Sequence, residues 1–281
     1  MKARVGFLGP LGTYTHQATK NNKRCAFPKP TQSHISQKDF PETLESLDTL
    51  DYTVVPRENS IFGSVIETFD GLKTLKRGTI QGEVVLKIQH CLVARKGAKI
   101  SDIDCVISHE QALGQCQKFL ARHLPSATTS STISTAAAAQ KVSKSQSLNV
   151  AAICSEICVT TFEGLEVLEK GIQDEDSNYT RFFVLSRNHG SNQSFTHVLL
   201  RITPRKTCAE HFDLTELLRT IDLSVTRIDR RPAPVSEPFL DTYFIEVAAS
   251  KNDTSGWPDR LSNSISRLKE RGHLAERIGQ W

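Results

Sequence analysis

The sequence predicts an α/β protein with a two-lobed, open-sheet first part and a small C-terminal domain of βαββαβ order. Short apolar runs alternate with helical patterns from residue 3 to about residue 187. Residues 188–194, NHGSNQS, are polar and contain Gly, Asn and Ser, which is typical of a linker. The strands and helices after this linker follow a different rhythm. Alternation of strands with helices favours an open sheet, so we expect domains at 1–188 and 195–281.

The elements of the first domain follow from the spacing of its apolar residues. Apolar runs of strand length recur along it, and apolar residues at helical spacing, such as Val65, Phe69 and Leu72, lie between them. The expected strands are 3–8, 51–56, 83–94 (one long strand or a pair), 104–109, 149–153 and 181–186, and the expected helices are 13–21, the segment around 65–72, 111–122, 134–143 and 155–171. This alternation favours an open α/β sheet divided between two lobes.

The C-terminal part has the order of a ferredoxin-like domain. The expected strands are 195–203, 224–231, 240–249 and 275–280, and the expected helices are about 212–221 and 257–271. A βαββαβ order within fewer than about 90 residues is typical of this compact motif.

Composition and charge restrict the classes of function. With 38% hydrophobic and 23% charged residues, the 281-residue chain is typical of a globular protein. Lys and Arg number 35 and Asp and Glu 31, and the basic residues are dispersed, so we expect no nucleic-acid partner. No apolar stretch approaches the ~20 residues that a membrane span needs, so we expect no membrane partner. A small anionic ligand is compatible with the net charge of +4.

The N-terminus and the cysteines indicate the compartment and the metal content. MKARVGFLGP enters a strand pattern at once, which leaves no room for a signal or transit peptide. The seven cysteines are odd in number and scattered, which favours reduced thiols and a cytoplasmic location. Cys105, His109 and Cys116 lack the spacing of a zinc site, so we expect no metal.

Four loops at the ends of predicted strands are rich in polar side chains. Enzymes with open α/β sheets place their sites in such loops. The first, GFLGPLGTYTHQA (6–18), has glycines spaced G-x-x-G-x-x-G, which differs from the dinucleotide-binding fingerprint. It fits two interpretations equally well. Either its backbone amides hold an anion together with the hydroxyls of Thr13 and Thr15, or it is a tight turn with a Thr cap.

The second and third loops carry more hydrogen-bonding groups than turns require. Glu58, Asn59 and Ser60 put three different polar side chains into one turn, although a helix cap needs only one of them. In the third loop Ser108 is placed to cap a helix, and Gln115 lies on a helical face that it shares with a second glutamine. A pair of amides suits a polar substrate, although a solvated helix face is the commoner reason for such a pair.

The fourth loop leads into the last strand of the first domain. Asn178, Thr180 and Arg181 lie where this strand begins, close to the domain boundary. An arginine here offers a planar, bidentate partner for a carboxylate. The alternative is a surface ion pair between Arg181 and Asp174 or Asp176.

Together these motifs resemble those of the prephenate dehydratase family over nearly the whole chain. GPLGTYTHQA, VPRENSIFGSVIETFDGL, SHEQALGQC, GLEVLEKGIQD and NYTRFFVL occur in that family's order and approximate spacing. Two positions depart from the family pattern. Arg57 stands where an aliphatic residue is usual, and Glu110 stands where Pro is usual.

The resemblance implies both a fold and a reaction. The fold is a two-lobed catalytic domain like that of periplasmic binding proteins, with the cleft between the lobes, followed by an ACT regulatory domain. The reaction is the decarboxylative dehydration of prephenate to phenylpyruvate, CO2 and water in L-phenylalanine biosynthesis, catalysed by a carbon-oxygen lyase. Aromatisation drives it, so we expect no cofactor.

The resemblance also assigns roles to the residues of the loops. The ring hydroxyl of the substrate is a poor leaving group, and Thr180 is expected to donate to it or to position it. A Thr hydroxyl is too weak an acid to act alone, so Glu58 is a candidate partner if burial raises its pKa. Asn59 and Ser60 complete the expected catalytic set. The expected substrate-binding residues are Thr13, Ser108, Gln115, Asn178, Arg181 and Phe182, of which Arg181 would orient a carboxylate and Phe182 would pack beneath the cleft.

For the C-terminal domain the resemblance implies allosteric binding of L-phenylalanine and assembly into a homodimer or homotetramer. Asp229, Arg231 and Pro232 match the family's Glu-Ser-Arg-Pro motif, in which Arg230 replaces Ser, and they are the expected effector-binding residues. The family's Gly-Ala-Leu element, which forms part of the phenylalanine pocket, is missing, and KTCAEHFDLTELL (206–218) stands in its place.

Three alternatives remain open at the level of the sequence. Arogenate dehydratase performs the same reaction on the amino analogue of prephenate. A non-catalytic binding or sensor module also consists of two lobes that close on a small anion. A dinucleotide-dependent enzyme would use the first glycine loop, but the glycine spacing and Pro10 disfavour this alternative.

Overall fold

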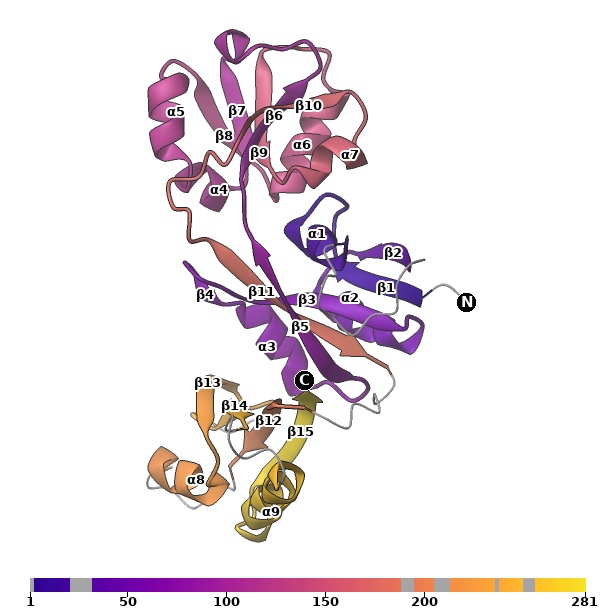
Figure 1. Cartoon of the computed structure of the whole chain (residues 1–281), viewed down its shortest axis with the longest axis vertical. Coiled ribbons are helices and arrows are strands. Elements are labelled where there is room, and N and C mark those ends of the chain that lie inside the picture. Colours follow the sequence, from indigo (N-terminus) through magenta and orange to yellow (C-terminus); the bar gives the residue numbers. More distant parts are fainter. Residues whose placement is uncertain (1–2, 21–31, 188–194, 205–212, 236–237, 250–255) are drawn as a thin grey trace.

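The computed structural model describes residues 3–20, 32–187, 195–204, 213–235, 238–249 and 256–281. Figure 1 shows three units along the longest axis of the molecule: a lobe from the middle of the sequence, a central lobe that contains the N-terminal strand, and a C-terminal unit. The two lobes confirm the predicted two-lobed α/β architecture. The predicted linker at 188–194 lies outside the described residues.

The central lobe is built on one part of a large mixed sheet. Its strands, in spatial order, are β5 (Thr79–Lys87), β11 (Tyr179–Ser186), β3 (Tyr52–Asn59), β1 (Ala3–Leu8) and β2 (Gln32–Gln37), and β4 (Gly63–Ser64) pairs with β3. Its helices are α1 (Tyr14–Lys20), α2 (Phe40–Glu45), η1 (Ser46–Asp48) and α3 (Ile66–Lys73). Strands β1, β2 and β3 are mutually parallel, whereas β11 runs antiparallel to both of its neighbours.

Strand β11 separates two cores. Phe182 and Val184 pack with Ala18 of α1 on one face of the sheet. Phe183 and Leu185 pack on the other face, where the Phe183 ring meets Phe69 of α3 edge to face. This alternation follows from the two-residue period of a strand, and it fixes the face on which each polar residue at the start of β11 lies.

The second lobe contains a separate five-stranded sheet. Its strands, in spatial order, are β10 (Leu165–Lys170), β6 (Cys91–Arg95), β9 (Val150–Cys154), β7 (Cys105–Ser108) and β8 (Thr128–Ser131). Its helices are η2 (Ile100–Asp102), α4 (Glu110–Gly114), α5 (Gln117–His123), α6 (Thr135–Lys144) and α7 (Ile157–Thr161). The chain enters this lobe after β5 and returns before β11, so two segments, 88–90 and 171–178, cross between the lobes.

The C-terminal unit confirms the predicted βαββαβ order. Its elements are β12 (His197–Thr203), α8 (Leu214–Ile221), β13 (Val225–Pro232), β14 (Asp241–Ala248), α9 (Trp257–Glu270) and β15 (Leu274–Gln280). The strands are arranged β13-β14-β12-β15, and the two helices pack on a core that includes Leu200, Ile245, Trp257 and Leu268.

The C-terminal unit continues the sheet of the central lobe. Gly279 of β15 pairs with Ile80 of β5, so the two parts form one ten-stranded sheet. A Cβ atom at position 279 would lie 2.5 Å from the Cβ of Ile80. The close approach of the two strands at this junction therefore depends on glycine.

Several predicted elements differ from the structure. Segment 155–171 is not one helix, because Gly164, with φ of +77°, separates α7 from β10, which pairs with β6. Segment 83–94 contains two strands, β5 and β6, but they belong to different sheets and do not pair with each other. Segment 111–122 is divided into α4 and α5. Strands β2 and β8 lie at sheet edges and are mostly polar, QSHISQ and TTSS, so they lack the apolar alternation that predicts a strand.

Candidate active site

A cleft of about 660 Å³ lies between the two lobes. The β1–α1 loop, the end of β3 and the start of β11 line it from the central lobe, and α4 and the first turn of α6 line it from the second lobe. Of the residues predicted from the sequence to form the site, six line this cleft, namely Thr13, Asn59, Gln115, Asn178, Thr180 and Phe182.

Asn59 and Thr180 form the centre of the polar side of the cleft. They are paired across β3 and β11, so their side chains lie side by side on one face of the sheet. The Asn59 Oδ1 atom accepts hydrogen bonds from the backbone N–H groups of Ile61 (2.9 Å) and Phe62 (3.1 Å). These donors fix the orientation of the amide, so its Nδ2 atom faces Thr180 and donates to Thr180 Oγ1 at 2.9 Å. Because this oxygen accepts from Asn59, the hydroxyl proton of Thr180 can be donated into the cleft.

Asn178 and Gln115 extend this arrangement to the second lobe. Asn59 Nδ2 also donates to Asn178 Oδ1 at 2.8 Å, and Asn178 Nδ2 donates to Gln115 Oε1 at 3.2 Å. Asn178 is 1% exposed and Thr180 is 9% exposed, so these groups are held away from bulk water. Phe182, two residues along β11, is buried on the same face and supports Thr180 from below.

The glycine loop presents Thr13 to the cleft. Thr13 Oγ1 donates to the carbonyl of Leu8 at 3.2 Å and accepts from the backbone N–H of His16 at 3.3 Å. Gly12 has φ of +91°, and its N–H donates to His16 Nδ1 at 3.1 Å. A Cβ atom at Gly12 would approach Cys158 Sγ of the second lobe to 3.0 Å. The loop is therefore a tight turn held by His16, and it fits against the opposite lobe.

His16 makes the stability of this loop dependent on pH. Burial, with smaller effects of Lys20 and His34, lowers the pKa of His16 to about 4. In the unfolded chain His16 has a pKa near 6.5, so as the pH falls the unfolded state binds a proton before the folded state does. The free energy of unfolding is therefore expected to decrease as the pH falls from about 6.5 towards 4, by up to about 3 kcal/mol. Urea unfolding of the wild type and of His16→Asn, at pH 7.5 and pH 4.5, measures this contribution. An identical pH dependence in both proteins would rule it out.

Four predicted site residues do not line the cleft. Glu58 and Arg181 each lie one position from a cleft residue along their strands, so they point to the opposite face of the sheet. Ser60 Oγ instead joins the β3 turn to β11, donating to the carbonyl of Ser177 and accepting from the N–H of Tyr179, each at 2.9 Å. Ser108 is fully buried and donates to the carbonyl of Ile153 at 2.6 Å. These four residues therefore lie away from the cleft that the other predicted residues line.

Glu58 and Arg181 belong to a charged hollow of about 740 Å³ between the central lobe and the C-terminal unit. Arg181 Nε lies 3.3 Å from Glu58 Oε1, and Arg227 of β13 pairs with the same carboxylate. The alternative of a surface ion pair for Arg181 was right in kind, but its partner is Glu58 rather than a nearby aspartate. The carboxylate of Glu58 accordingly contacts two guanidinium groups and faces away from the cleft.

Arg57 lies fully buried at the base of this hollow. Only 1% of its side chain is exposed, and its guanidinium contacts Glu83 of β5 at 2.7 Å and Glu246 of β14. The guanidinium carbon lies 4.8 Å from the centroid of the Phe183 ring. Arg57, which stands where an aliphatic residue is usual in the family, thus connects the central lobe to the C-terminal unit through buried ion pairs.

The residues expected to bind an effector contact the central lobe. Asp229 Oδ1 accepts from Ser64 Oγ at 2.5 Å. Arg231 donates to both carboxylate oxygens of Asp70 at 2.9 and 2.8 Å and thereby holds the pKa of Asp70 below its usual value. The carbonyl of Pro232 accepts from Lys73 at 3.1 Å.

Ser64 lines the cleft, so β13 supports the edge of the cleft from outside. The replaced Gly-Ala-Leu segment lies largely outside the described residues.

Sequence reasoning missed several residues that line the cleft. Tyr14 is hydrogen-bonded to His90, and His90 is hydrogen-bonded to Gln115. Other missed lining residues include Phe62, His109, Ser134 and Thr135. The sequence placed His90 inside a predicted strand, where a histidine is usually a buried or surface residue without a special role. Among the described residues that line the cleft there is no lysine or arginine, and Glu67 contributes a carboxylate.

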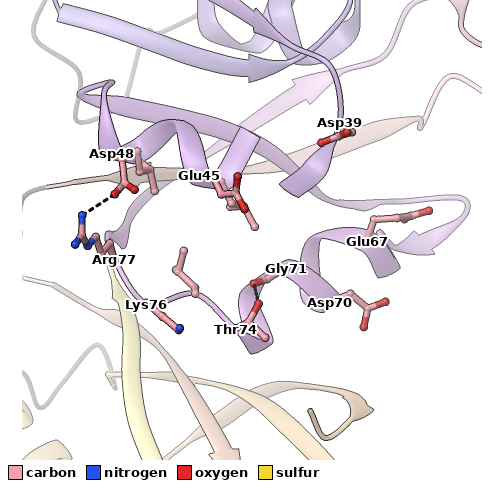
Figure 2. Close-up of a pocket in the computed structure, with 12 residues that line it drawn as sticks. Asp39, Glu45, Asp48, Glu67, Asp70, Gly71, Thr74, Lys76 and Arg77 are labelled. Atoms are coloured by element: carbon pink, nitrogen blue, oxygen red, sulfur yellow. Dashed lines mark hydrogen bonds and ion pairs between the residues drawn. The ribbon is translucent and has the colours of Figure 1, made fainter. Parts of the chain in front are cut away.

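A second hollow, of about 960 Å³, lies between α2, η1 and α3 (Figure 2). Figure 2 shows that its walls carry the carboxylates of Asp39, Glu45, Asp48, Glu67 and Asp70. Lys76 and Arg77 are its basic side chains, and Arg77 is paired with Asp48 at 3.1 Å. An excess of carboxylates disfavours an anionic ligand, so this hollow is not the candidate active site.

The described residues contain no cluster of metal ligands and no helix that could cross a membrane. No group of three or more His, Cys, Asp or Glu side chains among them is arranged to hold a metal ion. No helix in the described ranges is long and apolar enough to cross a membrane.

The fold and the cleft define a two-lobed α/β protein with a small-molecule site that is rich in amide and hydroxyl groups, and with an attached βαββαβ unit. The chain belongs to the prephenate dehydratase family, because the family model described as prephenate dehydratase matches residues 5–190. The chain is 33% identical over 252 residues to the bifunctional chorismate mutase/prephenate dehydratase of Escherichia coli K12, covering 88% of this chain and 64% of that protein. It is 37% identical over 188 residues to the prephenate dehydratase of Bacillus subtilis, covering 65% of this chain and 64% of that protein.

A solved structure extends the likeness to the whole chain. The prephenate dehydratase of Arthrobacter aurescens, solved in complex with L-Phe, superposes with a TM-score of 0.83 at 26% identity. The match covers 99% of this chain and 89% of that one, so it includes the C-terminal unit. The chain nevertheless spans less than two-thirds of the length of the two curated relatives, 64% in each case.

Proposed function

We propose that the chain catalyses the decarboxylative dehydration of prephenate to phenylpyruvate, CO2 and water in L-phenylalanine biosynthesis, as a carbon-oxygen lyase. The C–C bond to the ring carboxylate breaks, its electron pair enters the ring, and the ring C–O bond breaks as hydroxide leaves. One proton is taken up to form water. The observation that supports this reaction most strongly is the Thr180 hydroxyl, which is fixed by Asn59 and can donate into the cleft.

Thr180 is proposed to act on the departing oxygen. Negative charge grows on this oxygen as the C–O bond breaks, so a hydrogen bond from Thr180 strengthens in the transition state and lowers the barrier. Asn59 and Asn178 hold Thr180 in place, and burial keeps competing water away. Because Glu58 lies on the opposite face, Thr180 works with these amides rather than with a neighbouring carboxylic acid.

The amide and hydroxyl groups that line the cleft suit this chemistry. Both substrate carboxylates would be bound by hydroxyl and amide donors, including Gln115 and Ser134, rather than by Arg181. A cation against the carboxylate that is lost would stabilise the ground state more than the transition state, in which its charge has dispersed into CO2. Neutral donors bind this group without that penalty.

The test is the formation of phenylpyruvate from prephenate by the purified chain at neutral pH. We expect product above the spontaneous background. No excess product would overturn the proposed function and leave the non-catalytic binding module as the better account. Arogenate, which would yield phenylalanine, is assayed in parallel, and a higher kcat/KM for arogenate would assign the alternative substrate.

We further propose that residues 1–188 form the catalytic domain and that 195–281 form an ACT domain that binds L-phenylalanine, in a cytoplasmic homodimer or homotetramer. The βαββαβ order and the L-Phe in the Arthrobacter aurescens structure support this proposal. Asp229 and Arg231 are engaged by Ser64 and Asp70, so an effector at these residues would compete with contacts to the edge of the cleft. The same assay with added L-phenylalanine tests this, and unchanged rates together with no binding would exclude the effector.

A further inference from the structure

His90 occupies the first crossing between the lobes. It lies between β5 of the central lobe and β6 of the second lobe and is 3% exposed. Its backbone N–H donates to Gln173 Oε1 at 2.9 Å, and its carbonyl accepts from the N–H of Ile172 at 3.0 Å. Both partners belong to the returning crossing, so the two crossing segments together hold this residue in place.

The ring of His90 connects the two lobes through its two nitrogens. Nδ1 lies 2.7 Å from the hydroxyl oxygen of Tyr14, which is the first residue of α1 in the central lobe. Nε2 lies 2.6 Å from Oε1 of Gln115, which follows the last residue of α4 in the second lobe. One side chain at the hinge thus contacts a cleft residue of each lobe.

The hydrogen-bond donors along the cleft determine which nitrogen of His90 carries the proton. The backbone fixes the orientation of Asn59, and Asn59 donates to Asn178, so the Asn178 NH2 group donates onward to Gln115 Oε1. An oxygen can only accept, so His90 must place an N–H on Nε2 to bond the same atom. Nδ1 then carries a lone pair and accepts from the Tyr14 hydroxyl at 2.7 Å, a shorter contact than that of the same hydroxyl with the Gln89 carbonyl at 3.1 Å. Burial lowers the pKa of His90, more than its bond to Gln115 raises it, which keeps the ring neutral.

We propose that His90, as the neutral Nε2–H tautomer, is a positioning residue for the reaction at the cleft. By engaging Oε1 of Gln115 together with Asn178, it leaves the NH2 group of Gln115 to donate to the bound substrate. It also connects Gln115 and Tyr14, which come from opposite lobes. His90 makes no contribution of its own to bond breaking. The expected effect of His90 on kcat rests on the proposed function, whereas the assignment of its tautomer rests on hydrogen-bond geometry.

Two substitutions of similar polarity distinguish the roles of the two ring nitrogens of His90. The amide nitrogen of glutamine reaches the place of Nε2, so His90→Gln keeps a donor for Gln115. The amide nitrogen of asparagine reaches only the place of Nδ1, so His90→Asn loses that donor. We expect His90→Asn to lower kcat by about 10- to 100-fold, the usual cost of misplacing an orienting group, and His90→Gln to recover to within about 5-fold of the wild type.

A surface histidine of the second lobe provides the matched control. His123 is exposed at the end of α5, and His123→Asn is expected to leave kcat and KM unchanged. Thermal melting of each variant separates loss of fold from loss of positioning. Equal kcat values for His90→Asn and His90→Gln, in folded proteins, would overturn the role of the Nε2 donor.

The tautomer is measured independently in the wild-type protein. Nitrogen NMR of protein carrying 15N-labelled histidine, with the His90 signals identified by their loss in His90→Gln, reports which ring nitrogen carries hydrogen. We expect hydrogen on Nε2 alone at neutral pH, and hydrogen on Nδ1 would overturn the inference. This measurement involves no turnover. Absence of prephenate turnover with the expected tautomer would therefore count against the proposed function and not against the orientation of Gln115.

Discussion

Replacing Thr180 with valine is expected to lower kcat for phenylpyruvate formation by roughly 10²- to 10³-fold, the usual cost of removing one preorganised donor from a transition state. Valine keeps the β-branched shape that suits strand β11 and fills the same buried volume. Asn59 Nδ2 retains Asn178 Oδ1 and the Tyr179 carbonyl as acceptors, so the substitution leaves no orphaned donor. The loss should therefore lie in kcat, with KM changed much less. Steady-state kinetics with prephenate measure both.

Thr180→Ser is the control for this substitution. Serine keeps the hydroxyl and the acceptor for Asn59 and loses only a methyl group, so we expect kcat within about 10-fold of the wild type. Melting temperatures of both variants should stay close to that of the wild type, because the hydroxyl contributes little to the core. A valine variant as active as the wild type would remove Thr180 from the mechanism.

The pairing that brings Thr180 to Asn59 is the part of the site that the sequence could not supply. The motifs predicted that both residues belong to one cleft, and the structure agrees. Their direct contact, however, requires β3 and β11 to be neighbours in antiparallel register, with the whole second lobe inserted between them in the chain. Strand periodicity describes each strand alone and carries no information on which distant strand becomes its partner.

The misplacement of Glu58 has a local cause. A single turn containing Glu58, Asn59 and Ser60, as the sequence predicts, would leave all three side chains free to face a ligand. In the structure β3 continues to Asn59, and successive side chains of a strand point to opposite faces. Once Asn59 faces the cleft, Glu58 must face away from it, and the same argument moves Arg181 away from Thr180. Counted from the apolar runs of the two strands, strict period two predicts the face of Arg181 but not that of Glu58. The pairing of β3 with β11 shifts by one residue at Arg57, so Arg57 and Glu58 both face the charged hollow, and sequence periodicity does not reveal such a bulge.

Other differences reflect tertiary structure that overrides local preference. Segment 155–171 has helix-compatible residues, but Leu165 and the residues after it pair with β6 and cover its edge. The βαββαβ unit was predictable because its apolar periodicity is strong. Its continuation into the sheet of the central lobe was not, since this depends on a single close contact at Gly279.

The second large effect is expected at Arg57, whose substitution with leucine should destabilise the protein by about 3–5 kcal/mol. Removing the guanidinium leaves the carboxylate of Glu246, itself 6% exposed, without its cationic partner in a region with little water. Glu83 is affected less, because Arg181 lies 3.8 Å from its carboxylate and is half exposed. The free energy of urea unfolding at pH 7 measures the loss.

The double variant Arg57→Leu/Glu246→Leu distinguishes a lost ion pair from lost packing. Replacing both partners of a buried pair with apolar side chains is often nearly neutral, so the double variant should regain most of the stability that Arg57→Leu loses. The exposed pair of Arg77 and Asp48 is the matched control, and Arg77→Leu should leave the unfolding free energy nearly unchanged. If the double variant were as unstable as Arg57→Leu, the stacking of Arg57 on Phe183 would be the larger contribution. Recovery of stability in the double variant would instead show that the buried charges between the central lobe and the C-terminal unit account for the loss in Arg57→Leu.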